Sequence, residues 1–202
     1  MLSAIILAAG ESSRMGRPKA LLQWRGRPFI EYVCSALRLS GVEDRVVVFG
    51  RAFSEILASW TPAGEKVAVN LKPANGQLSS LRTGLGIVSE YSEAFVVCLA
   101  DQPTILPETY QKMIDFRFYH KDSIIIPRTI RPSDSLLKRG HPIIIPARYR
   151  NLCFEGPLDK GLHWVTHHPS VKIADLDVAD REIIRDFDTP EDYEQLKVRG
   201  SC

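Results

Sequence analysis

Small and cationic residues follow the first apolar run of the chain, in a spacing that suits phosphate binding. Residues 2–7 are rich in isoleucine and leucine and predict a buried strand, after which come three small residues at positions 8–10. Small residues let a ligand approach the backbone, whose N–H groups can then face phosphate oxygens. Arg14 and Lys19 add full positive charge close by. The pattern predicts a polyphosphate-binding loop at the end of the first strand.

The spacing of this loop excludes two well-known phosphate-binding motifs. A P-loop has four residues between its glycines and then Lys-Ser/Thr, whereas five residues separate Gly10 from Gly16 and Arg17 follows. The dinucleotide fingerprint G-x-G-x-x-G is also missing after the first strand. Gly84 and Gly86 lie elsewhere and lack a third glycine at the required distance. An NAD-dependent oxidoreductase is therefore not expected.

A carboxylate ends the most continuous strand pattern of the chain. Residues 94–100 predict a central strand, and Asp101 follows it. In open α/β sheets ligands bind at the carboxyl ends of strands, and a carboxylate there suits Mg²⁺, which takes oxygen ligands and substrate phosphates. The alternative, an N-cap for the helix expected at Pro107, places Asp101 too far upstream. One carboxylate seldom suffices, so a second must come from elsewhere in the fold.

Residues 72–82 form a second candidate segment for nucleotide contacts. The segment is polar, contains a glycine and leads into an expected helix N-terminus. Its candidates for base and ribose contacts are Asn75, Gly76, Ser79 and Ser80. The alternative is an ordinary loop followed by a helix that Ser79 caps.

Apolar strand-like runs alternate with helical patterns along the chain, which predicts an α/β fold with a mostly parallel sheet. The expected helices cover residues 29–40 and begin at Ser79 and at Pro107. Strands are expected at residues 45–50, 65–70, 94–100, 123–127 and 142–146. The polar stretch 128–140, with proline, glycine and alternating charge, predicts a mobile loop or lid.

Length and composition bound the class of protein. The 202 residues predict one domain, 1–202, and 45% hydrophobic with 25% charged residues are typical of a globular protein. A formal charge of +2 gives no reason to expect a nucleic acid or membrane partner, and the apolar runs are too short to span a bilayer. The four cysteines form no CxxC pair, so we expect free thiols, with Cys34 and Cys98 buried. Free thiols suit a cytoplasmic protein, and the N-terminal residues do not predict a signal peptide.

Residues 7–19, L-A-A-G-E-S-S-R-M-G-R-P-K, resemble the signature of nucleotidyltransferases that activate small phosphorylated molecules with an NTP. The form is closest to the molybdenum-cofactor cytidylyltransferase branch of the MobA-like NTP transferases. Guanylyltransferase relatives more often carry a glycine pair where Ala9 and Gly10 stand. The resemblance continues, in the family's order, through residues 75–85, 99–103, 139–142 and 186–193.

This resemblance implies a Rossmann-like three-layer sandwich of the nucleotide-diphospho-sugar transferase type. It implies that Asp101 and Asp188 hold Mg²⁺ and that Arg14, Lys19 and Asp101 are catalytic. Asp186 is the less favoured ligand, and the sequence after Asp188 is also a good helix start. The residues expected to bind the nucleotide are Leu7, Ala8, Ala9, Gly10, Lys19, Asn75, Gly76, Ser79 and Ser80.

The implied reaction is the transfer of CMP from CTP to molybdopterin, with release of pyrophosphate. The nucleophile is a phosphate monoester, whose second pKa near ~6 leaves it largely ionised at neutral pH, so no general base is required. Mg²⁺ on the phosphates, with Lys19 and Arg14, would neutralise the negative charge that develops in the transition state.

Residues 139–142, R-G-H-P, are distinctive of the cofactor-directed branch, where they lie on the acceptor side. Gly140 and His141 are therefore candidates for acceptor binding, although a histidine at a strand entry is equally well structural. The family usually has a Gly-Asp-x-Gly-Ala-Arg run further on, whereas this chain has His163 in place of the arginine. This departure leaves the acceptor's identity open. A zinc site at His163 and His167 is not expected, because no acid or cysteine completes the set.

Two alternatives to CMP transfer stay open. GMP transfer to the molybdenum cofactor, or NMP transfer to a sugar or polyol phosphate, keeps the reaction class and changes the substrate. A non-catalytic chaperone that inserts the cofactor into a molybdenum hydroxylase belongs to another class. The presence of Lys19, Asp101 and Asp188 together disfavours the chaperone, because binding alone would not need the metal pair.

Overall fold

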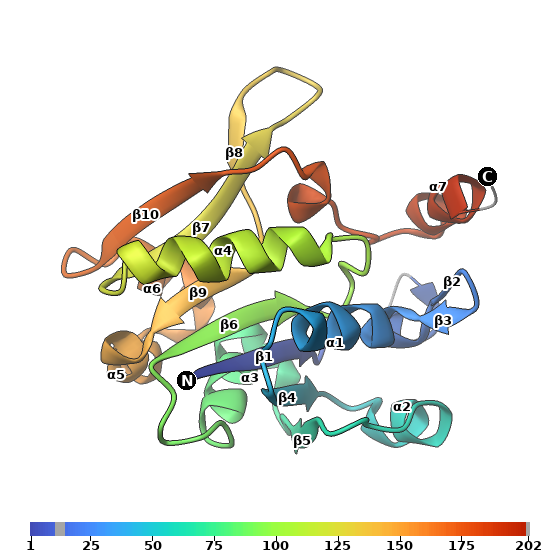
Figure 1. The fold of residues 1–202 in the computed structure, drawn as a ribbon. Helices are drawn as coiled ribbons and strands as arrows, with labels where there is room; N and C mark the ends of the chain where they lie inside the picture. Colours follow the sequence, from blue (N-terminus) through green and yellow to red (C-terminus); the bar gives the residue numbers. More distant parts are fainter. Residues whose placement is uncertain (11–14, 201–202) are drawn as a thin grey trace.

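A mixed β-sheet forms the centre of the structure, a computed structural model that describes residues 1–10 and 15–200 (Figure 1). Its strands are β1 (Leu2–Ala8), β4 (Asp44–Phe49), β5 (Lys66–Val69), β6 (Ala94–Leu99), β7 (Ser123–Ile130), β8 (Leu137–Arg139), β9 (Ile143–Pro146) and β10 (Lys172–Asp177). Across the sheet they follow the order β10-β7-β9-β6-β1-β4-β5, and β8 pairs with β7. β4 and β6 run parallel to β1, β5 to β4 and β10 to β7, whereas β9 is antiparallel to β6 and β7. The predicted α/β fold with a mostly parallel sheet is confirmed.

Successive side chains of β1 enter the two opposite faces of the sheet. Ala4 and Ile6 belong to one buried apolar cluster, and Ile5 and Leu7 belong to the other. A strand buried on both faces reads as a continuous apolar run, which is why residues 2–7 lack alternation. The sheet therefore needs a helical layer on each side.

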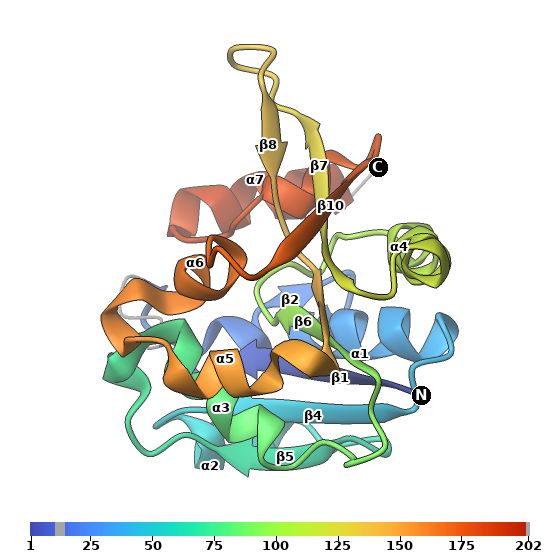
Figure 2. The same cartoon turned by 90° about the vertical axis from the view of Figure 1, so that its left-hand side faces the viewer.

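Helices supply both of these layers (Figure 2). The helices of the structure are α1 (Phe29–Leu39), α2 (Phe53–Ser59), α3 (Gly76–Leu85), α4 (Pro107–Tyr119), α5 (Arg150–Glu155), α6 (Gly161–Thr166) and α7 (Pro190–Gly200). Figure 2 shows α1 and α4 on one side of the sheet and α3, α5 and α6 on the other. Ile56 of α2 joins the apolar cluster of α1 and α4. The predicted three-layer sandwich is confirmed.

Gly84 lets α3 approach the sheet closely. A Cβ atom at this position would collide with the Ile5 side chain of β1 and lie 3.1 Å from Cγ2 of Val48 on β4. The missing side chain therefore brings α3 against the two strands whose carboxyl ends it borders.

The C-terminal segment packs against the N-terminal part of the chain. Phe187 and Tyr193 surround Phe29, with ring centroids 5.6 and 6.0 Å away. The Tyr193 hydroxyl also donates a 2.8 Å hydrogen bond to the backbone carbonyl of Gln23 in the β2 (Gln23–Trp24) and β3 (Arg27–Pro28) ribbon. This small cluster holds the segment before α7 beside the turn that carries Lys19, the 3₁₀ helix η2 (Lys19–Leu21).

Most expected elements lie where the sequence placed them. α1 and α4 begin at Phe29 and Pro107 as predicted, and β6 covers the predicted central strand. The expected N-cap at Ser79 is wrong, because α3 begins at Gly76, directly after the 3₁₀ turn η3 (Pro73–Asn75). The Ser79 hydroxyl instead accepts a 3.0 Å hydrogen bond from the Asn70 side-chain amide.

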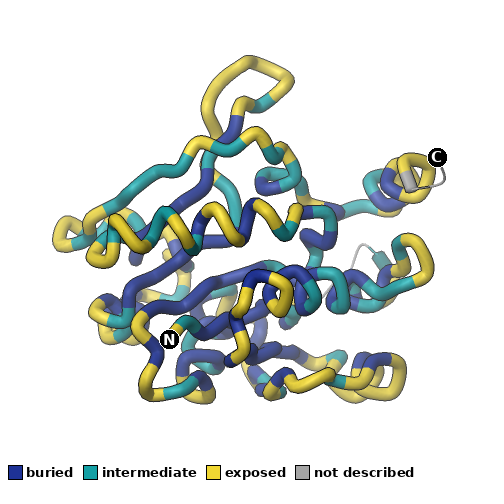
Figure 3. Tube along the Cα trace, in the orientation of Figure 1, coloured by how far each residue is buried: buried dark blue, intermediate teal, exposed yellow. Residues whose placement is uncertain are grey.

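The prediction of a loop over residues 128–140 is wrong, because both ends of this stretch belong to a projecting β-hairpin. β7 continues to Ile130, and β8 pairs antiparallel with it. Alternating charge suits such an exposed ribbon, since Arg139 donates two hydrogen bonds of 2.7 and 2.8 Å to Asp175 of β10. The hairpin tip, at the top of Figure 3, is exposed. Whether the hairpin moves as a lid stays a prediction.

Three cysteines of the described part of the chain are buried. Cys34 and Cys98 were expected to be buried thiols, and Cys153 joins them. Burial raises the pKa of the Cys153 thiol to about 12, which leaves it inert at neutral pH. Among the helices within the described residues, none has the length and apolar character that crossing a bilayer requires.

Candidate active site

A pocket of about 420 Å³ opens at the carboxyl ends of the central parallel strands. Ligands of open α/β sheets bind at this edge, because the loops that leave neighbouring strands diverge there. The pocket is lined by Leu7, Ala8, Ala9, Gly10, Pro18, Lys19, Ala20, Gly50, Ala52, Ile56, Pro73, Gly76, Gln77, Ser80, Leu99, Ala100, Asp101 and Asp188. It therefore joins the first loop to the ends of β4 and β6, the start of α3 and the segment before α7.

The backbone of the first loop is pressed against the end of β4. A Cβ atom on Gly50 would lie 2.6 Å from the Ala9 carbonyl oxygen, closer than any side chain tolerates. Glycine is therefore required at position 50, and a larger residue would push the first loop into the pocket. This close approach fixes one wall of the pocket through the backbone alone.

Lys19 lies between two carboxylates from distant parts of the chain. Its Nζ donates a 3.0 Å hydrogen bond to Oδ2 of Asp101 and a second to Oδ1 of Asp188. Burial lowers the pKa of Lys19, but the hydrogen bonds and negative charges of Asp188 and Asp101 outweigh it and raise that pKa above its ordinary value. The Lys19 side chain therefore remains a full positive charge at the edge of the pocket.

The strand end and the helix start place these two carboxylates independently. Asp101 follows β6, whose residues are nearly all buried. Asp188 precedes Thr189. The Thr189 Oγ1 accepts a 3.2 Å hydrogen bond from the Asp192 backbone N–H, and the Asp192 carboxylate accepts a 3.0 Å hydrogen bond from the Thr189 backbone N–H. Thr189 and Asp192 thus cap α7 and leave the Asp188 carboxylate to face Lys19. The predicted helix start is confirmed, and it is compatible with the predicted role of Asp188 as a site carboxylate.

A third carboxylate lies beside this pair. The Asp186 carboxylate accepts a 3.1 Å hydrogen bond from Gln102 Nε2. Partial burial and the negative charges of Asp101 and Asp188 raise the pKa of Asp186. Asp186 thus adds a third negative charge close to Asp101 and Asp188, and the Lys138 charge partly offsets their effect on the Asp186 pKa.

The donor chemistry of Asp101 and Asp188 fits Mg²⁺. Both supply carboxylate oxygens, converge on one point and remain partly accessible, with 25% and 43% of their side chains exposed. Within residues 1–10 and 15–200, no three His, Cys, Asp or Glu side chains are arranged to hold a metal ion by themselves. A cation here would need substrate phosphates or water to complete its shell, as Mg²⁺ commonly does. The assignment of Asp101 and Asp188 as metal ligands stays a prediction.

The structure brings together most of the residues predicted to bind the nucleotide. Those that line the pocket are Leu7, Ala8, Ala9, Gly10, Lys19, Gly76 and Ser80. Asn75 and Ser79 lie outside its lining: Asn75 is exposed in η3, and the Ser79 hydroxyl is hydrogen-bonded to Asn70. Their nucleotide-binding roles stay predictions that this geometry does not support. Arg14 lies outside the described residues.

Several pocket residues were not found from the sequence. Gly50 follows a strand and could have been noticed as a possible close approach, since glycine at a strand end permits one. Ala52 and Ile56 lie in an ordinary amphipathic segment and carry no signal of a binding role. Gln77 and Pro73 lie in the segment that was singled out, but the side chains that reach the pocket could not be distinguished without the helix start.

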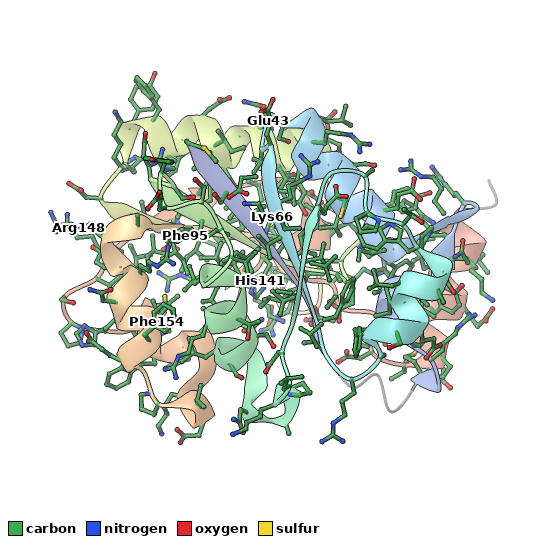
Figure 4. The ribbon with its side chains drawn as sticks, turned by 90° about the horizontal axis from the view of Figure 1, so that it is seen from below. Glu43, Lys66, Phe95, His141, Arg148 and Phe154 are labelled. Carbon is green, nitrogen blue, oxygen red and sulfur yellow. The ribbon has the colours of Figure 1, made fainter. Side chains whose placement is uncertain are left out.

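Gly140 and His141 pack beneath the carboxylate cluster and do not line the pocket. A Cβ atom on Gly140 would collide with the backbone of Ile183 in the 3₁₀ turn η6 (Arg181–Ile184), and the His141 N–H donates a 3.0 Å hydrogen bond to the Ile183 carbonyl. Burial lowers the pKa of His141 to about 4, although the Asp101 charge opposes this. Its Nε2 atom is buried without a hydrogen-bond partner among the described residues. Figure 4 shows His141 toward the middle of the molecule and Arg148 at its edge.

His163 of α6 and His167, which follows the end of that helix, contact each other through their rings. The rings of His163 and His167 stack in parallel, with centroids 3.7 Å apart and planes 12° from parallel. Stacked rings direct their nitrogen lone pairs side by side and not toward a common point.

Comparison with known proteins identifies the family. A model described as the MobA-like NTP transferase domain matches residues 4–171. The chain belongs to this MobA-like family. The resemblance seen in the first loop and in the later sequence blocks is thereby confirmed.

The relatives of this chain have names that describe different activities. Nicotine blue oxidoreductase of Paenarthrobacter nicotinovorans is 30% identical over 152 residues, which cover 74% of this chain and 72% of that protein. A probable molybdenum cofactor guanylyltransferase of Bacillus cereus is 26% identical over 125 residues, covering 61% and 60%. The bifunctional protein GlmU of Sorangium cellulosum is 36% identical over 114 residues, and the chain spans only 24% of its length.

Solved structures share the fold of this chain. Rv0371c of Mycobacterium tuberculosis matches with a TM-score of 0.84 and 27% identity, covering 98% of this chain and 97% of that one. The same protein is known as a complex with manganese, which matches with a TM-score of 0.80 and 26% identity and covers 98% of each chain. This MobA-like NTP transferase therefore shares nearly its whole fold with a protein that has been solved as a complex with manganese.

Proposed function

We propose that this nucleotidyltransferase transfers CMP from CTP to a molybdopterin-type acceptor and releases pyrophosphate. The observation that carries the proposal is the Lys19 ammonium between Asp101 and Asp188 at the edge of the pocket. A charged lysine beside two carboxylates suits a reaction in which phosphates and a divalent cation must be brought together.

In this proposal the chain acts by positioning and by charge. The loop after β1 and the start of α3 hold the nucleotide, with the backbone wall at Gly50 setting the width of the pocket. The phosphate nucleophile is already ionised at neutral pH, so no residue of the chain needs to remove a proton. Lys19 stabilises the negative charge that grows on the phosphates during transfer, because its raised pKa keeps it protonated.

We propose Mg²⁺ as the cofactor, held by Asp101 and Asp188 together with the substrate phosphates. When bound, the ion would supply charge neutralisation and polarise the α-phosphate. The manganese complex of Rv0371c supports a divalent cation in this fold. Mg²⁺ is preferred in the proposal because carboxylate oxygens and phosphates are its usual ligands.

The acceptor and the base are proposed from the relatives and from the form of the first loop. The relative named molybdenum cofactor guanylyltransferase favours a molybdenum-cofactor acceptor, and the form of the first loop favours CTP over GTP. Arg14 is proposed to assist Lys19, and Gly140 and His141 to shape the acceptor side. Transfer of GMP to the same acceptor is the alternative within this class.

Oxidoreduction is a second candidate, because the relative that covers 74% of this chain is named nicotine blue oxidoreductase. The chain has no dinucleotide fingerprint after β1, which disfavours it. An assay of NAD(P)H oxidation run beside the transferase assay distinguishes the two functions.

We also propose a cytoplasmic location, since buried free thiols without pairing suit a reducing compartment. A molybdenum hydroxylase is the proposed recipient of the nucleotide-bearing cofactor. Co-purification of such an enzyme with the tagged chain from its own cells would test the partner.

A pyrophosphate-release screen across ATP, CTP, GTP and UTP, with and without molybdopterin, tests the proposed function. The expected result is release that needs CTP, molybdopterin and Mg²⁺ together. Release with GTP alone among the nucleotides would move the proposal to the guanylyl alternative. No release with any nucleotide, together with NAD(P)H oxidation, would replace it with the oxidoreductase.

A further inference from the structure

A buried glutamine links the strand end that carries Asp101 to the segment that carries Asp188. Gln102 is only 2% exposed. Its Nε2 donates to the Asp186 carboxylate at 3.1 Å and to the Arg185 carbonyl at 3.2 Å, and the Ile183 carbonyl lies at 3.5 Å. All of these acceptors belong to residues 183–186, immediately before Asp188. The Gln102 side chain thus connects the residue next to Asp101 to the segment that leads to Asp188.

The chemistry of this contact requires an amide group. Each of the three atoms that Gln102 Nε2 meets is an acceptor, so only a side chain that donates can satisfy them. A carboxylate in its place would repel Asp186, and an apolar side chain would leave the carbonyls unmet. Gln102 Oε1 is itself buried without a hydrogen-bond partner in the described part of the chain. Burial of an unpaired oxygen costs stability, which is tolerated more readily where the other end of the amide has a role.

Phe187 fixes the other side of the same segment. It is fully buried and its ring lies 5.6 Å from that of Phe29. With Gln102 holding residues 183–186 and Phe187 anchored in the core, the backbone that presents Asp188 has little freedom. The Asp188 carboxylate is then directed toward Lys19 and Asp101.

We propose that Gln102 is a positioning residue, whose amide holds residues 183–186 so that the Asp188 carboxylate is directed toward Lys19 and Asp101, where the two carboxylates would share a divalent cation. The inference rests on the proposed function only for its metal. Hydrogen-bonded groups behind ligating carboxylates orient them, and their loss commonly weakens metal affinity by about 10- to 100-fold.

A titration with Mn²⁺ alone, in which electron paramagnetic resonance measures the concentration of the free ion, tests this proposal without nucleotide or acceptor. Gln102→Met keeps the length of the side chain and removes the donor, so Mn²⁺ should bind on the order of tenfold or more weakly. Gln102→Glu should weaken it further, because it adds a negative charge that points at Asp186. If the glutamate variant fails to fold, the methionine variant decides.

Thr104→Val is the matched control. Thr104 Oγ1 donates a 2.6 Å hydrogen bond to Glu182, so this substitution breaks another link between the same two segments, away from the carboxylate pair. Its Mn²⁺ affinity should stay within about twofold of wild type, even where its melting temperature falls as far as that of Gln102→Met. In turnover assays Gln102→Met should raise the Mg²⁺ concentration for half-maximal rate and leave the NTP KM nearly unchanged.

Wild-type Mn²⁺ affinity in Gln102→Met would overturn the proposal, and so would an equal loss in Thr104→Val. Hydrogen exchange at the backbone N–H groups of residues 186–189 provides a readout that needs no metal, and it should accelerate in Gln102→Met and not in Thr104→Val. A wild-type chain that fails to transfer CMP would contradict the proposed function and leave the Mn²⁺ and exchange results decisive for Gln102.

Discussion

The pocket around Lys19 and the packed region around His141 both carry sequence blocks of the MobA-like family, but the fold uses the two blocks differently. At the pocket, Lys19, Asp101 and Asp188 converge from three distant segments on one point. In the other region, Gly140 and His141 pack against η6, and neither lines the pocket. Family motifs can therefore line a pocket in one place and pack outside its lining in another.

The difference follows from the position of each block in the sheet. The pocket lies at the carboxyl ends of β1, β4 and β6, where parallel strands bring their last residues to a common edge. Residues 139–142 instead connect β8 to the antiparallel strand β9, whose start lies between β6 and β7. The start of β9 lies at the same edge, since Ile143 pairs with Val97 of β6, but η6 packs over Gly140 and His141 there and separates them from the pocket lining.

The largest effect is expected at Asp101. Asp101→Ala should lower the turnover number by at least about 10³-fold, because it removes a proposed metal ligand and one partner of Lys19. The fold should survive, since the side chain contributes nothing to the apolar core, and the melting temperature checks this. Asp188→Ala should act in the same direction and raise the Mg²⁺ requirement. Full activity in Asp101→Ala would remove the pocket as the reacting centre.

Lys19→Ala should lower the turnover number by on the order of 10²–10³ and raise the NTP KM by much less, because its charge matters most in the transition state. Steady-state kinetics at varied CTP separates the two constants. Lys66→Ala is the matched control. Lys66 lies on β5 outside the pocket lining, is half exposed and forms an ion pair of 2.8 Å with Asp44 of β4. A change in KM alone would make Lys19 a binding residue.

A smaller effect, on stability, is expected at His141. Its pKa is lowered from 6.5 to about 4 in the folded chain, so the unfolded chain binds the extra proton between these values. The contribution of neutral His141 to the free energy of unfolding is therefore complete above pH 6.5. It is lost as the pH falls toward 4, and the loss amounts to at most roughly 3 kcal/mol. Urea unfolding from pH 7 to 4.5 should show less acid sensitivity in His141→Gln than in wild type. The exposed His167→Gln serves as the control, and equal slopes for all three proteins would refute the assignment.

The sequence predicted most of the strands and the edge of the sheet where the pocket lies, and the acceptor roles of Gly140 and His141 stay predictions. Continuous apolar runs such as residues 2–7 indicated strands buried on both faces, and Asp101 at the end of one indicated the edge where ligands bind. Ser79 was misplaced because serine is as common in a first helical turn as at an N-cap, and the start of α3 depends on η3. Residues 128–140 were misread since their charges pair with Asp175 and Asp177 of β10, which are far away in sequence.

The role of Gln102 and the approach of Gly50 to Ala9 could not be read from the sequence at all. Both depend on contacts between segments that no local pattern connects, 84 residues apart for Gln102 and Asp186. Propensity and periodicity report on the neighbours of a residue along the chain, and not on the segment that packs against it.

The central claim is that the pocket binds the nucleotide and the packed region around His141 does not. Calorimetric titration of CTP with Mg²⁺ into the Gly50→Ala and His141→Ala proteins tests this claim most directly. Gly50→Ala adds a Cβ atom that would lie 2.6 Å from the Ala9 carbonyl oxygen, so the first loop must shift and CTP should bind on the order of tenfold more weakly. His141→Ala should keep the wild-type CTP affinity within about twofold, because the pocket lining does not include it. A well-folded His141→Ala protein that loses CTP binding, beside a Gly50→Ala protein that retains it, would contradict the account.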